Sequence, residues 1–374
     1  MKLGIDVSTY LEELQHGAKY YDGDTQIDPL DAFRANGVEY VRTRVWNDPR
    51  SEKGEPYLAG NCGMENFLAL AKLVTDKGFE LLLDLHYSDF WADPAKQVPP
   101  KAWATMGLEE LENAVYQFTR NTIERIKSGG YELPLIQIGN EITNGMLWPV
   151  GRLKENEDGT RGNYEPLCRL LKAGIRATRE ISPQTRIILH LERSHDAVIY
   201  DEFFTNMEKF GVDYDIIGAS YYPYWHGTLA DLFANLNNCK RFNKQIMIME
   251  LGYGFTLENY VLEGGSAARL VVDQSNAEEF GFVREYPISP KGQAMFVKEF
   301  LCEAEKNGVE CVFYWEPLWI PGKDICWASE QGQEYIGEGG KSTTNEWANQ
   351  CLFDYSGKML PAFKEFSTNT YQYI

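Results

Sequence analysis

Eight apolar runs of strand length, separated by helical segments, predict a single-domain α/β fold of the TIM or (β/α)8 barrel type. This alternation is the pattern of βα units that close a parallel sheet, and eight is the number of strands that closes this barrel. A chain of 374 residues suits such a barrel as one domain spanning residues 1–374. We place the strands at Leu3–Val7, Tyr40–Trp46, Glu80–His86, Leu135–Gly139, Arg186–His190, Asp215–Tyr221, Ile246–Glu250 and Cys311–Trp315.

Helical periodicity fills the segments between these runs. Met64–Lys77 carries apolar residues at helical spacing and ends before Gly78, a residue suited to the left-handed turn after a helix. A second apolar stripe runs from Leu167 to Ile175, and Lys291–Lys306 repeats the pattern. We interpret all three stripes as faces that pack on the core.

The connections that follow the strands are unequal in length. Those after strands 3, 4, 7 and 8 are long, whereas the connections from a helix to the next strand are short. In a barrel these long segments all lie at the C-terminal ends of the strands, the face that carries the active site. They are Tyr87–Gly107, Ile142–Asn163, Leu251–Ser289 and Glu316–Pro361.

Composition limits the kind of partner. The formal net charge of −19 argues against nucleic acid and anionic membranes and fits a neutral ligand. Aromatic residues make up 13% of the chain, and many of the 9 Trp fall in predicted loops, which favours a flat apolar ligand such as a sugar face. We expect a monomer that acts on a neutral polysaccharide or oligosaccharide and binds neither nucleic acid nor a membrane.

The N-terminus and the cysteines bear on the compartment. MKLGIDVSTY enters a strand without an apolar signal core, and no stretch is long enough to span a bilayer. We therefore expect a cytoplasmic protein, with secretion after removal of a leader as the alternative. The seven cysteines are scattered and odd in number, which favours reduced thiols, while a bridge between Cys326 and Cys351 stays open.

Two of the predicted strands end in a glutamate. LIQIGNEITNGMLWP stops being strand-like at Asn140-Glu141, and IMIMELGYG does so at Glu250. Glycoside hydrolysis needs two such carboxyl groups, one to protonate the leaving oxygen and one to attack or to activate water. For either glutamate alone, a structural salt bridge is the alternative. Because Asn140 and Glu141 are adjacent, the strand must end or bulge there for both to reach a substrate.

Alternation sorts the second strand. It places Arg42 and Arg44 inside the barrel, where a guanidinium needs a carboxylate partner. Glu250 is our candidate, since the pairing would keep it ionised as a nucleophile. The alternative is a structural ion pair with Asp6 or Asp84.

The same alternation points Asp84 and His86 inward from the third strand, toward sugar hydroxyls or a catalytic glutamate. A metal site would need His86, His190 and His226, but HExxH and HxH spacings are absent, so we expect no metal and no other cofactor. The residues that we expect to bind substrate are Arg44, Asp84, His86, Trp91, Asn140, Trp148, Tyr221, Tyr222, Trp225, His226, Trp315 and Trp319.

Five motifs in order carry a family resemblance. The motifs are DLHYSDFWADPAKQVPPKAW, GNEITNGMLWPVG, SYYPYWHGTL, MELGYGFT and YWEPLW, between GIDVS near the start and CLFDYSGKMLPA near the end. With these motifs the chain resembles glycoside hydrolase family 53, the endo-β-1,4-galactanases of the retaining TIM-barrel clan.

The resemblance implies that Glu141 is the acid/base, that Glu250 is the nucleophile and that the substrate is β-1,4-galactan of pectin. It also implies a cis peptide bond between Trp315 and Glu316. Calcium-binding members carry an acidic motif that Gly264–Arg284 lacks, so we expect no calcium. The alternatives are an endo-β-1,4-mannanase or glucanase of the same clan, or a sugar-binding barrel without activity.

Overall fold

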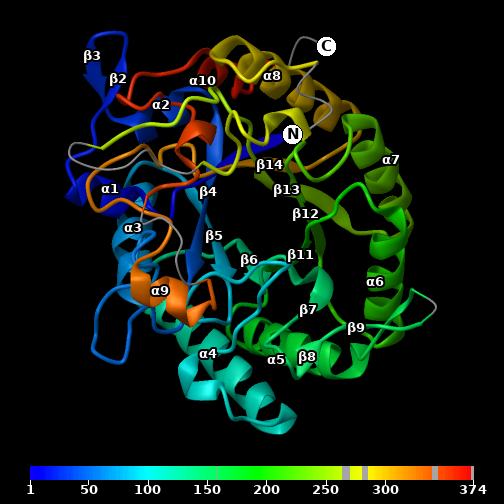
Figure 1. The fold of residues 1–374 in the computed structure, drawn as a ribbon. Helices are drawn as coiled ribbons and strands as arrows, with labels where there is room; N and C mark the ends of the chain where they lie inside the picture. Colours follow the sequence, from blue (N-terminus) through cyan, green and yellow to red (C-terminus); the bar gives the residue numbers. More distant parts are fainter. Residues whose placement is uncertain (158, 263–269, 280–284, 339–343, 372–374) are drawn as a thin grey trace.

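The computed structural model describes residues 1–157, 159–262, 270–279, 285–338 and 344–371. Its parallel strands close into a barrel in the order β1-β14-β13-β12-β11-β6-β5-β4, which confirms the predicted (β/α)8 fold (Figure 1). Each predicted strand is present, with ends shifted by at most a few residues. The strands are β1 (Lys2–Asp6), β4 (Val38–Val45), β5 (Glu80–Leu85), β6 (Leu135–Ile138), β11 (Arg186–Leu191), β12 (Ile216–Tyr221), β13 (Gln245–Leu251) and β14 (Cys311–Trp315).

Helices surround the barrel (Figure 1). The helix predicted from Met64 is α3 and ends at Asp76, with Gly78 in the left-handed region at φ 82°. The helices are α1 (Tyr10–Gln15), α2 (Pro29–Ala35), α3 (Met64–Asp76), α4 (Leu108–Ser128), α5 (Tyr164–Ile181), α6 (Ala197–Lys209), α7 (Leu229–Cys239), α8 (Pro290–Lys306), α9 (Glu330–Tyr335) and α10 (Pro361–Glu365).

Short two-stranded hairpins lie in the connections between the barrel elements. They are β2 (Tyr20–Asp22) with β3 (Thr25–Ile27), β7 (Gly145–Met146) with β8 (Gly151–Arg152), and β9 (Lys154–Glu155) with β10 (Arg161–Gly162). Tyr371 lies beside the first residue, because its Oη donates to the carbonyl oxygen of Met1 at 2.6 Å. Within the described ranges, no helix combines the length and the apolarity that crossing a bilayer requires.

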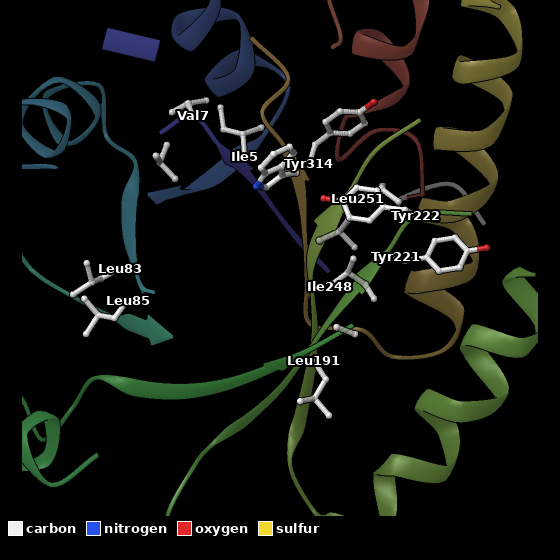
Figure 2. Close-up of a cluster of buried hydrophobic side chains, with 14 of the residues drawn as sticks. Ile5, Val7, Leu83, Leu85, Leu191, Tyr221, Tyr222, Ile248, Leu251 and Tyr314 are labelled. Atoms are coloured by element: carbon white, nitrogen blue, oxygen red, sulfur yellow. The ribbon is translucent and has the colours of Figure 1, made fainter. Parts of the chain in front are cut away.

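The strands are buried on both faces, as their apolar composition predicts. One layer of side chains packs between barrel and helices, and Figure 2 shows part of it, including Ile5, Leu83 and Ile248. A second, smaller cluster fills the barrel interior, and we call it the apolar plug. Its members are Tyr40, Leu82, Leu135, Ile188, Ile216, Met247, Met249, Cys311 and Phe313.

On several strands, a polar residue lies two positions after a member of this apolar plug. Arg42 follows Tyr40, Asp84 follows Leu82, and His190 follows Ile188. Residues two apart in a strand share a face, so these polar side chains form the next layer inside the barrel, toward the C-terminal ends of the strands. The apolar plug therefore supports a buried polar layer directly beneath the loops.

Two details concern the cysteines and the backbone. All seven cysteines are free thiols, so the Cys326–Cys351 bridge is not formed. The expected cis bond between Trp315 and Glu316 is wrong: among the described residues, the cis peptide joins Trp148 to Pro149. Glu316 instead has a left-handed φ of 47°, which turns its carboxylate toward Arg44 and Thr9.

Candidate active site

A cavity of about 300 Å³ lies at the C-terminal ends of the barrel strands. Its walls come mainly from the strand ends and from three of the four connections predicted to be long, those after β5, β13 and β14. Indole rings and carboxylates dominate the lining. The lining residues are His86, Trp91, Ala92, Asp93, Lys96, Asn140, Glu141, Tyr222, Trp225, Glu250, Val271, Trp315, Trp327, Glu338, Glu346 and Trp347.

Glu141 and Glu250 face each other across this cavity. A carboxylate oxygen of Glu141 and one of Glu250 lie within 4.8 Å of each other. Strand β6 ends at Ile138, and Glu141 takes left-handed backbone angles, φ 46° and ψ 51°, which are unusual for a residue with a side chain. The prediction that the strand must end before Asn140 and Glu141 is confirmed, and the turn allows both side chains to reach the site.

Two neighbouring side chains hold Glu250. Arg42 Nη1 donates to its Oε1 at 2.9 Å, and the Tyr222 hydroxyl donates to its Oε2 at 2.8 Å. The register of β12 against β13 shifts between Ala219 and Ser220, beside Glu250. Both carboxylate oxygens are therefore oriented before any ligand arrives.

Arg42 is the centre of the buried polar layer. Its Nη1 also lies 2.9 Å from Asp6, and its Nη2 lies 2.8 Å from Asp84 and 2.9 Å from Asn140. Arg42 therefore pairs with Glu250, the predicted partner, and also with Asp6 and Asp84, the alternative partners. Dense pairing of this kind offsets the cost of burying a guanidinium and fixes its fork in one orientation.

Burial and neighbouring charges separate the two glutamates. Burial raises the pKa of Glu141 well above its usual range, and the negative charges of Glu250 and Glu192 raise it further. Burial also raises the pKa of Glu250, but Arg42 and Tyr222 oppose that rise. Glu250 is therefore the group that ionises first and Glu141 the group that keeps its proton.

Asp84 stays ionised beneath this pair. Burial alone would raise its pKa, but Arg42 and His86 outweigh burial and lower the pKa. His86 completes the contact, with Nε2 3.0 Å from Asp84, while its Nδ1 accepts from the backbone N–H of Ala92 at 3.2 Å. The ring of His86 is therefore held at the cavity wall.

A line of polar contacts leads from Arg42 to Glu141. His190 Nδ1 lies 3.0 Å from Asn140 Oδ1, and its Nε2 lies 2.8 Å from Ser220 Oγ. Ser220 Oγ in turn lies 2.6 Å from Glu141 Oε1. Burial lowers the pKa of His190 well below its usual value, and the Arg42 charge adds to this effect.

A second hollow of about 700 Å³ adjoins the first on the Glu141 side. Glu192 and Trp225 help to line it, together with His226, whose Nδ1 accepts from the backbone N–H of Tyr222 at 3.0 Å. Trp225 belongs to both spaces and is 46% exposed. The two spaces therefore adjoin at Glu141, which also lines both of them.

Seven of the twelve residues expected to bind substrate line one or both of these spaces. They are His86, Trp91, Asn140, Tyr222, Trp225, His226 and Trp315. The remaining five lie elsewhere.

Tyr221 and Tyr222 were both expected near Glu250, but only Tyr222 points there. Successive residues of a strand face opposite ways, so Tyr221 projects from the outside of the barrel. Its ring stacks on Phe296 and Phe300 of α8, and its hydroxyl donates to Gly227 O at 3.0 Å. Figure 2 shows Tyr221 directed toward the outer helices.

Arg44 and Asp84 lie in the buried layer below the cavity. Arg44 donates to Glu316 at 2.6 Å and to the carbonyl oxygen of Ala59 at 3.0 Å. The inward direction of Arg44 was predicted correctly. Because Arg44 lies two residues after Arg42 on β4, its guanidinium meets Glu316 instead of Glu250. Asp84 serves Arg42 and His86 and does not line the cavity.

Trp148 and Trp319 also lie outside the cavity lining. Trp319 is fully buried beneath Trp91 and Trp327, whose rings cover it from the cavity side. Trp148 lies under the guanidinium of Arg152, 4.2 Å from the ring centroid, and its indole N–H donates to Asn144 O. Trp319 therefore supports the floor of the site, while Trp148 stiffens the loop after β6.

Several cavity residues were missed. Trp327 and Trp347 come from the long connection after β14, where no periodic pattern indicates direction. Lys96 and Glu338 pair across the cavity rim at 2.7 Å, from loops that follow different strands. Ser220 was also missed; it lines neither space but contacts Glu141 from below, and the sequence could have indicated it because Ser220 shares a strand face with Tyr222.

One cluster of side chains in the site has the residue types that could bind a metal ion. Ligand-type atoms of Glu141, His190 and Glu250 lie within 4.8 Å of one another in the part of the chain that the structure describes. Both ring nitrogens of His190 already contact polar partners, and Arg42 borders Glu250, so the residues fit a hydrogen-bonded acid pair better than a cation site. In the region where calcium was considered, residues 264–269 and 280–284 lie outside the described residues.

Comparison with known proteins identifies the family. The model of glycosyl hydrolase family 53 matches residues 2–366. The chain belongs to glycosyl hydrolase family 53. A solved family 53 catalytic domain from Ignisphaera aggregans superposes with a TM-score of 0.85 at 36% identity, covering 99% of this chain and 96% of that one.

Curated relatives also match this chain over nearly its full length. An endo-β-1,4-galactanase of Bacillus subtilis strain 168 is 32% identical over 97% of this chain and 84% of its own length. A protein of Niallia circulans, described only by its place in the bgaB 5′ region, is 37% identical over 96% and 92%. The residues that form the cavity lie within the matched range.

Proposed function

We propose that this protein is an endo-acting, retaining glycoside hydrolase that cleaves internal β-1,4-galactosidic bonds. The observation that carries the proposal is the pair of buried carboxyl groups, Glu141 and Glu250, within 4.8 Å of each other in an aromatic cavity. Retaining enzymes hold such groups about 5 to 5.5 Å apart, whereas inverting enzymes separate them by roughly 6.5 to 9.5 Å. The choice of galactan rests on membership of the family and on the named relative from Bacillus subtilis.

In the proposed reaction, Glu250 attacks the anomeric carbon while Glu141 gives its proton to the leaving oxygen. Arg42 and Tyr222 hold Glu250 ionised and aimed before the attack. Once the sugar is bonded to Glu250, that negative charge disappears, so the pKa of Glu141 falls. Glu141 then accepts a proton from the water that releases the sugar.

The proposed sugar contacts divide between stacking and hydrogen bonding. Trp91, Trp225 and Trp315 line the two spaces with aromatic rings, and the polar side chains of His86 and Asn140 also line the cavity. The indole N–H of Trp347 is buried without a partner among the described residues, so it offers a donor to a sugar hydroxyl. A neutral galactan also suits a chain with net charge −19.

We also propose that residues 1–374 act as one catalytic domain and as a monomer. The pairing of β1 with β14 closes the barrel between the first and last strands, and α10 packs against α8. The catalytic glutamates come from strands on different sides of that barrel. Truncation between β12 and β13 should therefore remove activity.

The decisive test replaces Glu250 with Ala and follows galactan hydrolysis. Turnover should disappear, and azide should restore part of it by forming the glycosyl azide of inverted configuration. Restoration with retained configuration would contradict the role of Glu250. Parallel assays of the unaltered enzyme on galactan, mannan and carboxymethyl cellulose test the substrate, and preference for either of the last two would contradict the galactan assignment.

A further inference from the structure

The contacts between Asn140, His190, Ser220 and Glu141 form one unbranched line inside the barrel. The three links measure 3.0, 2.8 and 2.6 Å, and Asn140, His190 and Ser220 are each at most 5% exposed. Each link needs one hydrogen atom between its two heavy atoms. The direction in which these hydrogens point follows from the fixed end of the line.

Asn140 is the fixed end. Its Oδ1 faces Arg42 Nη2 at 2.9 Å, and a guanidinium nitrogen can only donate. Its Nδ2 faces the carbonyl oxygen of Ala92 at 2.9 Å, and a carbonyl oxygen can only accept. The amide therefore cannot be flipped, and Oδ1 is an acceptor.

His190 must then carry a hydrogen on Nδ1, because that atom contacts Asn140 Oδ1. The remaining two links, from Nε2 to Ser220 and from Ser220 to Glu141, need two hydrogens. The serine hydroxyl supplies one of them. The other belongs either to Glu141, with His190 neutral, or to Nε2 of His190, with Glu141 ionised.

The surrounding charges favour the first arrangement. Arg42 lies on the His190 side of the line and disfavours an imidazolium there, while Glu250 lies on the other side and disfavours a second carboxylate. The pKa of His190 is lowered, and the pKa of Glu141 is raised even when Ser220 is taken as a donor that would lower it, so both shifts point the same way. The charged and titratable groups that face the two residues are Arg42, His86, Asp93, Glu192, Tyr200, Tyr222, His226 and Glu250.

We infer that, in the unliganded protein, protonated Glu141 donates to Ser220 and Ser220 donates to His190. Ser220 and His190 are thus positioning residues that keep the acid of the reaction in its protonated form. This inference rests on the proposed role of Glu141. It goes further by giving the carboxyl group a hydrogen-bond acceptor where a donor would be expected.

The arrangement also affects the second half of the reaction. When Glu141 has given its proton away, only the serine hydrogen remains for two links. The hydroxyl can then serve either Glu141 or His190, and one buried polar atom loses its partner. Taking a proton from the attacking water restores both links, so the line favours the return of Glu141 to its protonated state.

The first experiment is the Ser220→Ala variant, compared by the pH profile of kcat/KM on galactan. Loss of the acceptor destabilises the protonated acid, so the alkaline limb should move to lower pH by about one unit. A limb that stays in place or moves upward overturns the inference. Ser194→Ala is the matched control, because Ser194 is fully buried and its hydroxyl has no partner among the described residues.

The second experiment needs no activity. Nitrogen NMR of the unliganded enzyme should show His190 as the neutral tautomer with hydrogen on Nδ1, the signal being assigned among the five histidines with His190→Gln. In Glu141→Gln the signal should keep this form. An imidazolium, or hydrogen on Nε2 alone, overturns the inference even if Ser220→Ala does not fold.

The two experiments separate this inference from the function on which it rests. If the enzyme does not hydrolyse galactan, the function fails while the NMR result still reports the hydrogen-bond direction. If galactan is hydrolysed but the limb moves upward, the function stands and Ser220 is a donor to Glu141.

Discussion

Arg42 and Glu250 form a buried ion pair, with Nη1 2.9 Å from Oε1, and the arginine side chain is only 1% exposed. The strands that carry them, β4 and β13, are not neighbours in the barrel, so the pair spans its interior. Since the same guanidinium also binds Asp6 and Asp84, the pair belongs to a network that is fixed before substrate binds.

Replacing Arg42 with Lys should therefore affect both stability and pH dependence. One ammonium cannot serve four acceptors, so the free energy of unfolding should fall by about 3 kcal/mol. Glu250 also loses the guanidinium that stabilises its ionised form, so its pKa should rise. The acid limb of the kcat/KM profile should therefore move to higher pH. Denaturant unfolding and pH profiles measure the two effects.

Arg44→Lys is the matched control, because Arg44 is equally buried two residues along β4 but pairs with Glu316. It should lower stability and leave the acid limb in place. Equal movement of the limb in both variants would contradict the specific link between Arg42 and Glu250.

Removing the hydroxyl in Tyr222→Phe should raise the pKa of Glu250. A hydrogen bond to a charged group contributes about 1.5 kcal/mol, so the acid limb should rise by about one pH unit. Tyr221→Phe controls for the loss of a buried hydroxyl, since Tyr221 Oη donates to Gly227 outside the barrel. That variant should lose about 1 kcal/mol of stability and keep the wild-type profile. An unmoved limb in Tyr222→Phe would argue against its role.

The indoles of Trp225 and Trp319 should respond differently to replacement by Ala. Trp225 is 46% exposed and lines both spaces, so its loss should raise KM for galacto-oligosaccharides about tenfold with little change in Tm. Trp319 is 0% exposed, so its loss should cost about 3 to 5 kcal/mol of stability. Calorimetry beside steady-state kinetics separates the cases, and a large fall in Tm for Trp225→Ala would mark that residue as core.

Stability should depend on pH through Glu12, which is 3% exposed and accepts from the backbone N–H of Gly60 at 2.8 Å. Burial raises its pKa from 4.5 to about 7, against the opposing effects of Gly60 and Arg44. The folded state then holds a proton that the unfolded state releases, so this contribution is full below pH 4.5 and is lost as the pH rises to about 7.

Glu12→Gln removes this titration. Between pH 5 and pH 8 the wild type should lose about 1 to 3 kcal/mol relative to the variant, as measured by denaturant unfolding. Glu65→Gln is the control, because the Glu65 side chain is 84% exposed. Parallel curves for the wild type and Glu12→Gln would show that Glu12 does not titrate in this range.

The strand pattern was readable from the sequence because each strand of a closed parallel barrel is apolar on both faces and ends abruptly. That placed Glu141 and Glu250 at strand ends, and alternation turned Arg42 inward. The same rule, applied to β12, would have separated Tyr222 and Ser220 from Tyr221. Side chains two positions apart lie on the same face of a strand, and adjacent side chains lie on opposite faces. The error at Tyr221 was therefore avoidable.

Other features depended on long-range packing. Trp327 and Trp347 reach the cavity through a connection whose path is set by contacts with distant loops, such as the stacking of Trp327 on Trp91. The four side chains that the Arg42 guanidinium contacts, Asp6, Asp84, Asn140 and Glu250, lie 36 to 208 positions away along the chain. Local periodicity holds no information about such distances.

The amino-acid sequence by itself determined the barrel, the strand ends and the residue types that glycoside hydrolysis requires, because these follow from local periodicity and side-chain chemistry. Only the tertiary structure decided which aromatic rings face the cavity, which arginine meets Glu250 and how Asn140, His190 and Ser220 align behind Glu141. Hydrogen bonds and ion pairs depend on separations of about 3 Å between atoms, and barrel closure brings those atoms together from strands far apart in the chain.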